Sequence, residues 1–181
     1  MGTPLQDAFA RAEAENLTLL EFVRAAVPDD FADPRAIAVA VDAGLRPDIY
    51  VPTVVAIRGG YNAGRLVASW DAARITALLD AIERGDWLVR YRTRAYADPS
   101  NMRERSDYAT LLRRAGYFDD ATREFLWLWQ QDVAQFQPVR HSFVAGEMAT
   151  LAARHAPARA AFVALRDAID PVPLDFKILH D

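Results

Sequence analysis

The glycine-rich segment 59–65 has the residue spacing of a loop that binds phosphate. Its glycines follow the pattern G-x-x-x-x-G after an apolar run, and in a P-loop the backbone N–H groups of such a segment bind phosphate oxygens. A P-loop continues with lysine and then serine or threonine, whereas this sequence continues with Arg65 and Leu66. A glycine-rich turn is therefore the favoured interpretation. The alternative hypothesis is a small enzyme acting on an anionic, phosphate-bearing ligand held at Gly59–Arg65.

The histidines and carboxylates form no recognisable catalytic or metal-binding pattern. His141 and His155 share one face of a predicted helix but lie about 21 Å apart at 1.5 Å per residue, too far for one metal ion or one proton relay. The chain has no cysteine, which excludes disulfides and thiolate metal sites. The acidic loop 29–33 lacks the glycine and the terminal glutamate of a calcium loop. The sequence therefore predicts no catalytic residue, no metal and no cofactor.

Three arginines alternate with other residues after Val89. In a strand, Arg90, Arg92 and Arg94 would present three guanidinium groups on one face. A helix over 87–96 is the competing interpretation. Such a row can bind phosphate or an acidic partner, although a solvated outer face is the more frequent explanation. Nucleic-acid binding through these residues is the weakest of the functional hypotheses.

The composition predicts a chain that can bury a sizeable core. Of its 181 residues 52% are hydrophobic, and a domain of this length removes roughly 70% of its unfolded surface from water. No run approaches the ~20 apolar residues of a membrane span, and the first residues lack the apolar stretch of a signal peptide. We expect a cytoplasmic protein of one domain, 1–181, with a mixed part, 1–100, helical hairpins, 101–171, and a tail, 172–181.

Charge is distributed unevenly along the chain. Residues 1–44 contain eight acids and three arginines, a net charge of −5, whereas residues 84–123 contain nine arginines and six acids, a net charge of +3. The overall charge of −4 gives no reason to expect nucleic acid as a partner. Lys177 is the only lysine, and arginine used almost alone is typical of a GC-rich genome.

Capping patterns predict several helices before residue 100. Thr18 with Glu21 resembles a capping box, in which the two side chains bind the first free N–H groups of a helix, and Pro28 would end that helix. A β-branched run around Pro52 instead favours a strand near a sheet edge, over 49–57. The helices expected in this part are 4–16, 18–27, 34–43 and 71–84.

The stretch from Tyr108 to Trp129 is predicted to form a helical hairpin. A helix ends at Gly116, and a second begins with two acidic residues that suit its positive end. Trp127 points away from the apolar stripe of the second helix, so it either packs on a neighbouring helix or marks a contact surface. The stripe contains Phe118, Ala121, Phe125, Trp129, Val133 and Phe136, which share one face at helical spacing.

A second hairpin, over 139–169, repeats features of the first. Ala158 and Phe162 have the spacing of Ala121 and Phe125. With Gly116, Phe118 and Pro171, these residues make the segment 103–171 similar to tetratricopeptide repeats, although the repeat distance is 37 residues where that family uses roughly 34. The resemblance implies a mainly α fold of antiparallel helical hairpins packed as a TPR-like array, beside a small β element in the N-terminal half.

The resemblance also implies a binding groove lined by the first helix of each hairpin. Several arginines around Phe143 would suit an acidic or C-terminal peptide, although a solvated helix face is about equally expected. We therefore predict a protein- or peptide-interaction module, acting as an adaptor, regulator or inhibitor, with no membrane partner. The predicted groove residues are Arg103, Thr110, Arg113, Arg114, Arg140, Phe143 and Glu147, with Ser106 and Thr150 beside them.

Overall fold

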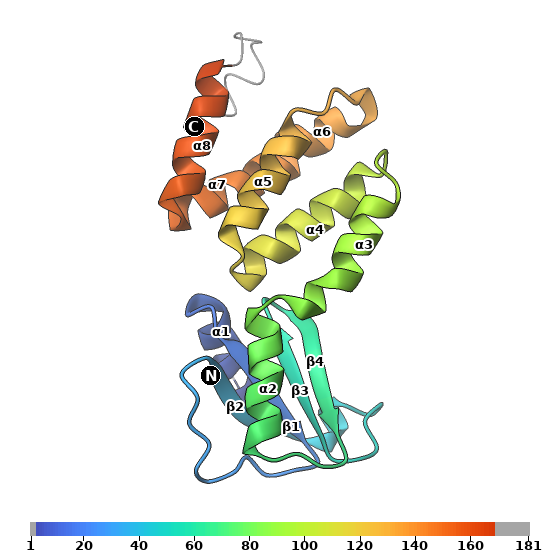
Figure 1. Ribbon diagram of the computed structural model, residues 1–181, viewed down its shortest axis with the longest axis vertical. Helices are drawn as coiled ribbons and strands as arrows, with labels where there is room; N and C mark the ends of the chain where they lie inside the picture. Colours follow the sequence, from blue (N-terminus) through green and yellow to red (C-terminus); the bar gives the residue numbers. More distant parts are fainter. Residues whose placement is uncertain (1–2, 169–181) are drawn as a thin grey trace. The chain divides into compact units, whose positions relative to one another are not determined.

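The computed structural model describes residues 3–168, and the chain divides into two compact units, Met1–Arg90 and Tyr91–Asp181 (Figure 1). The first unit contains a four-stranded mixed sheet and the second is helical. The prediction of a mainly helical chain with a small β element in its N-terminal half is therefore confirmed. The predicted tail, 172–181, lies outside the described residues.

The sheet of the first unit has two buried strands in its centre and two strands at its edges. Its strand order is β2-β1-β3-β4, with β1 and β2 parallel and the other pairs antiparallel. Nearly every residue of β1 and β3 is buried, whereas β2 is mostly half-buried. The strands are β1 (Thr18–Val23), β2 (Ala36–Val41), β3 (Thr53–Arg58) and β4 (Tyr61–Val67).

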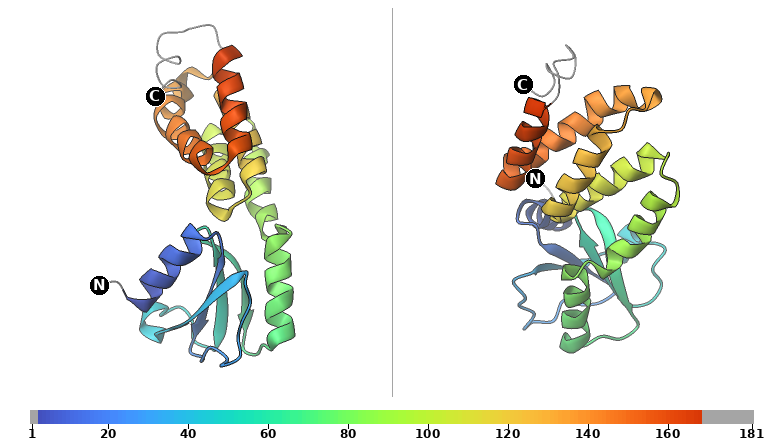
Figure 2. Two further views of the ribbon diagram at one scale, coloured as in Figure 1. Left: turned by 90° about the vertical axis from the view of Figure 1, so that its left-hand side faces the viewer. Right: turned by 45° about the horizontal axis from the view of Figure 1, so that its top comes forward.

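One helix covers each face of this sheet (Figure 2). On one face α2 (Ala72–Glu83) packs Leu79 against a fully buried cluster that includes Phe22 and Val54. On the other face α1 (Pro4–Ala14) places Leu5 against the smaller cluster around Val23. Because successive side chains of a strand point to opposite faces of the sheet, the strands contribute to two apolar layers, one under each helix.

Two of the predicted helices are wrong. Residues 18–23 and 36–41 form β1 and β2, and the expected helix end at Gly44 is a short 3₁₀ turn, η1 (Ala43–Leu45). The β-branched run predicted as an edge strand does form β3, which begins after Pro52 but lies in the interior of the sheet. The predicted helix 4–16 forms as α1, and a capping box starts it, in which the Thr3 side chain accepts from the N–H of Gln6.

The second unit consists of helices, and the predicted hairpin forms its centre. Asn101 caps α4, and Gly116 ends it with a φ of 89°. Residues 89–97 form a helix rather than a strand, and α5 ends at Trp129 instead of continuing to Phe136. The elements are α3 (Val89–Ala97), α4 (Met102–Ala115), α5 (Phe118–Trp129), α6 (Gln137–Val139), the π-helical turn η4 (Arg140–Val144), α7 (Ala145–Arg154) and α8 (Ala156–Ala168), with the 3₁₀ turn η3 (Ala134–Phe136). A further 3₁₀ turn, η2 (Asp86–Leu88), lies near the end of the first unit, just before α3.

The predicted TPR-like repeat array is a wrong description of this chain. A mixed sheet occupies the first half, where helices would have been needed to cover one end of a short stack. The hairpins also differ, because a 3₁₀ turn and a π-helical turn interrupt residues 134–144, which the resemblance assigned to regular helices. Similar spacing of Ala121, Phe125, Ala158 and Phe162 reflects burial in two helical hairpins.

Candidate functional site

Two of the predicted groove residues bind each other. The Nε of Arg113 lies 2.6 Å from a carboxylate oxygen of Glu147, and their side chains are only 13% and 17% exposed. The pair joins α4 to α7 across 34 positions of sequence. A guanidinium held in this way stabilises the packing of two helices and is not free to receive a ligand.

Arg140 is also engaged within the chain. Its Nη1 donates to the carbonyl oxygens of Trp129, at 3.0 Å, and Gln131, at 3.3 Å. Its guanidinium carbon lies 5.5 Å from the centre of the Trp129 ring. The Arg140 guanidinium thus donates to carbonyl groups at the end of α5, which have no hydrogen-bond partner within the helix.

The remaining predicted groove residues lie on α4 and in η4. Arg103 is exposed in the first turn of α4, and Arg114 near its end is half-buried. The hydroxyl of Thr110 is buried and, among the described residues, has no hydrogen-bond partner. The arginines of the predicted groove therefore have different roles in the structure. Arg113 and Arg140 hold helices together, whereas Arg103 faces solvent.

The π-helical turn η4 exposes apolar side chains. Phe143 lies within it and is 45% exposed, and Val139, one turn earlier, is 40% exposed. The wider spacing of a π-turn is rare and occurs frequently at functional sites. We call Val139 and Phe143 the Phe143 surface.

Sequence reasoning missed a polar cluster, partly buried, that joins three helices. The Arg105 guanidinium lies between the rings of Tyr96 and Trp127, 4.0 Å and 3.8 Å from their centres. Its Nε donates to Glu124 at 2.6 Å, and the Tyr96 hydroxyl donates to the same carboxylate. Burial, followed by this hydrogen bond, raises the pKa of Tyr96. Trp127 thus packs against a neighbouring helix, the first of its two predicted roles.

The segment 59–65 forms a hairpin turn and the start of β4. Gly59 and Gly60 have φ values of 57° and 85° and connect β3 to β4, which is the geometry of a tight hairpin turn. The following residues are a strand, so no helix N-terminus faces the turn as it would in a P-loop. Arg65 lies exposed on β4. This geometry gives the phosphate-binding hypothesis no support.

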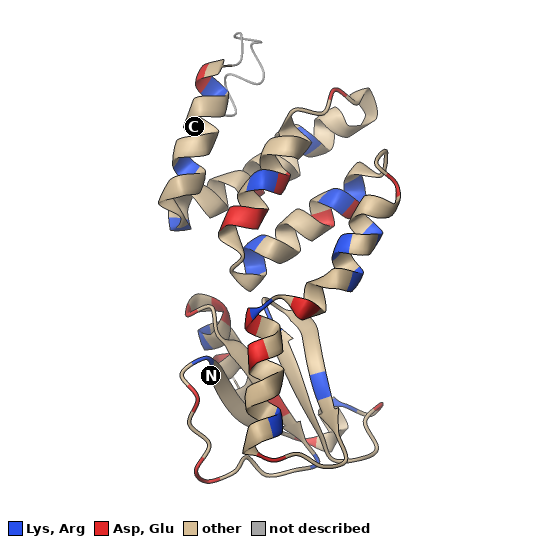
Figure 3. Ribbon diagram, in the orientation of Figure 1, with Lys and Arg blue, Asp and Glu red and all other residues tan. Residues whose placement is uncertain are grey.

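The three arginines after Val89 lie on α3 and do not form a ladder on one face. Arg94 is ion-paired with Glu104 at 2.5 Å, and Arg90 donates to the carbonyl of Asn62 at 2.6 Å. Residues two positions apart in a helix point about 200° apart, so Arg92 faces away from Arg90 and Arg94. Charges of both signs mark this part of the ribbon in Figure 3.

Comparison with protein-family models, with curated proteins and with solved structures finds no match. Within residues 3–168, no group of three or more histidines and carboxylates is arranged to hold a metal ion. In the same part of the chain, each helix is too short or too polar to span a bilayer.

Proposed function

We propose that this chain is a protein-interaction module whose helical unit binds a partner protein through the Phe143 surface. The exposed phenyl ring in a π-helical turn is the observation that carries the proposal. Large apolar side chains that can enter a pocket of the partner supply most of the affinity of a typical interface. The role is that of an adaptor, regulator or inhibitor.

The arginines of the predicted groove have two different roles in this proposal, according to the contacts that each one makes. Arg113 and Arg140 fix the helices that carry the Phe143 surface. Arg103 is exposed, and residues 84–123 have a net charge of +3. Positive charge of this kind favours a partner with acidic residues, because such charges steer association.

The test compares two exposed apolar residues of the same unit. Phe143→Ser and Val163→Ser change side chains that are 45% and 40% exposed, and Val163 lies on α8, outside the Phe143 surface. In affinity capture from the cells that make the protein, we expect F143S to lose a partner that wild type and V163S both retain. Equal capture by all three chains would contradict the proposal.

The structure also shows which variants are unsuitable for this test. Reversing the charge of Arg113 would leave Glu147 facing a second carboxylate inside the helical unit, so loss of binding could reflect loss of packing. Arg103→Glu reverses an exposed charge that has no described partner and tests the contribution of charge alone. Location in the cytoplasm stays a prediction, which fractionation of the producing cells would check.

A further inference from the structure

We propose a second interaction surface, in the α/β unit, where edge strand β2 accepts an extended segment of a partner protein that carries basic residues. The added segment would become a fifth strand of the sheet. This proposal is independent of the Phe143 surface, which belongs to the helical unit. It rests on the hydrogen-bonding groups of β2, on the slot beside them and on the charge of the crossover loop between β1 and β2.

The backbone of β2 has groups that point away from the sheet. The N–H of Thr18 donates to the carbonyl of Arg35 at 2.9 Å, which turns residue 35 toward β1. Backbone groups alternate sides along a strand, so the N–H and C=O groups of Ala38 and Ala40 face outward. Among the described residues these groups have no hydrogen-bond partner. They lie two positions apart, as the pairing groups of a strand require.

The sequence of β2 lacks the usual protection of an edge strand. Natural edges are blocked by lysine, by proline, by a bulge or by an inward-pointing charge. Residues 36–41 read AIAVAV and pair with β1 in continuous register. At the opposite edge, the Arg90 guanidinium covers the Asn62 carbonyl of β4. Residues 36–41 therefore leave the edge of β2 without these protections.

A slot of about 480 Å³ runs beside the first half of β2. One wall is the end of α1 with Leu17, and the other is the crossover loop, residues 24–35, which connects β1 to β2. Val27, Phe31 and Ile37 give the slot an apolar interior. Phe31 is fixed there by edge-to-face packing on Phe22, with ring centres 6.3 Å apart. An extended segment could bury an apolar side chain in this slot while its backbone pairs with β2.

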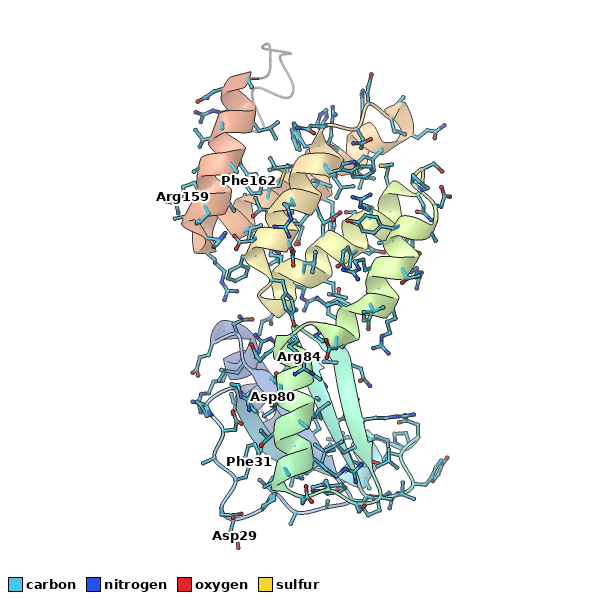
Figure 4. All side chains as sticks on the ribbon, in the orientation of Figure 1. Asp29, Phe31, Asp80, Arg84, Arg159 and Phe162 are labelled. Carbon is cyan, nitrogen blue, oxygen red and sulfur yellow. The ribbon has the colours of Figure 1, made fainter. Side chains whose placement is uncertain are left out.

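Charge on the crossover loop, which forms one wall of the slot, indicates the kind of segment that fits. Two arginines of the walls are already ion-paired, Arg11 with Glu15 and Arg35 with Asp33. Asp29 and Asp30 on the crossover loop are exposed and have no partner among the described residues. Figure 3 shows acidic residues along this loop, and Figure 4 shows Asp29 at its tip. These two aspartates lie outside the residues that line the slot, on the loop that forms one of its walls. Their unpaired negative charge favours lysine or arginine in the segment.

The same charge argues against a second copy of this chain as the occupant. Pairing β2 with β2 of another copy would bring together two segments that carry the same sign of net charge. Like charges brought together in this way oppose association. Residues 1–44, which supply both walls of the slot, have a net charge of −5.

The experiment uses the full chain and two fluorescein-labelled peptides of nine residues, one alternating lysine with valine and the other glutamate with valine. Fluorescence anisotropy should give a Kd at least tenfold lower for the lysine peptide. Ala38→Pro should raise that Kd at least tenfold, because proline removes the outward N–H and is tolerated at an edge position that donates no ladder bond. Ala38→Val is the matched control, since it adds carbon atoms but keeps the N–H.

Two further variants test the role of the aspartates and the independence of β2 from the Phe143 surface. D29N/D30N should weaken the lysine peptide severalfold and reduce its salt dependence, and F143S should bind it as wild type does. Equal affinity for both peptides, no binding of the lysine peptide, or undiminished binding to a folded A38P would each overturn the proposal. A wild-type dimer that A38P converts to a monomer would overturn it in favour of a second copy as the occupant.

Discussion

Arg105 and Glu124 form a largely buried ion pair in the helical unit. Its side chain is 11% exposed and that of its partner Glu124 is 9% exposed. The guanidinium between two aromatic rings combines an ion pair with cation–π contacts from α3 and α5. The cluster therefore fixes three helices by contacts that only an arginine can make, because the planar fork both stacks and donates.

We expect Arg105→Met to destabilise the protein by about 3 kcal/mol, because it leaves the Glu124 carboxylate buried without its cation. Urea unfolding measures the loss. Arg123→Met is the control, since that arginine is 69% exposed and its pair with Asp120 contributes at most about 1 kcal/mol. The double change R105M/E124L should recover much of the loss, and a double variant as unstable as the single one would contradict this explanation.

Asp33 gives a prediction about pH. The Arg35 side chain donates to both of its carboxylate oxygens, at 2.8 and 3.0 Å, and these hydrogen bonds lower the pKa of Asp33. Because the folded-state pKa lies below the unfolded value of about 3.9, the pair stabilises the protein above that pH, and the stabilisation is lost as pH falls through the folded pKa.

Asp33→Asn should therefore be less stable than wild type by up to about 1 kcal/mol at pH 6, and the difference should shrink below about pH 4. Urea unfolding of both chains at pH 6 and pH 3 checks it. A difference that stays constant between these two pH values would show that the Asp33 carboxylate gains nothing from Arg35.

At the scale of elements, most local capping patterns marked the correct end of a helix, but one of them lies in a strand. Asp71, Asn101 and Gly116 each occupy the predicted helix end. Thr18 and Glu21 match the same kind of pattern, yet they lie in β1, where Glu21 is bound by Arg46. A strand buried on both faces has no alternation of apolar and polar residues, so its sequence could not be told from that of a buried helix.

The binding residues were harder to predict than the helices that carry them. The sequence identified Arg113 and Glu147 as groove residues, but they form a pair across 34 positions. Such pairing depends on how helices pack, which local periodicity does not encode. Their opposite charges on two helices of one predicted groove were the available signal. The π-helical turn at Phe143 left no recognised signal in residues 137–144.

Helix α2 provides a test of capping in the α/β unit. The Asp71 side chain accepts from the N–H of Arg74 at 2.8 Å, so Asp71→Ala should cost about 1 kcal/mol. Thr76→Ala, an exposed change in the middle of the same helix, should leave stability unchanged or slightly higher, because alanine favours the helix. Thermal unfolding followed by circular dichroism compares them, and equal melting temperatures would rule out a capping role for Asp71.

At the scale of the whole molecule, the α/β unit has a core of its own. Phe22, Leu79 and Ile82 are almost fully buried in a cluster formed within residues 20–87. We expect a fragment of residues 1–88 to unfold cooperatively in urea, with the fluorescence of Trp70 and Trp87 and the far-ultraviolet circular dichroism changing together. Separate transitions for the two signals would show that this unit needs the rest of the chain.

The boundary between the units divides the chain into two continuous halves. Every strand of the sheet is therefore present before the ribosome begins the helical half, and translating that half takes on the order of ten seconds. Small domains generally fold within seconds, so the sheet has time to form on the nascent chain. During that interval the unprotected border of β2 is exposed in the crowded surroundings of the ribosome, where a partner or a chaperone would meet it first.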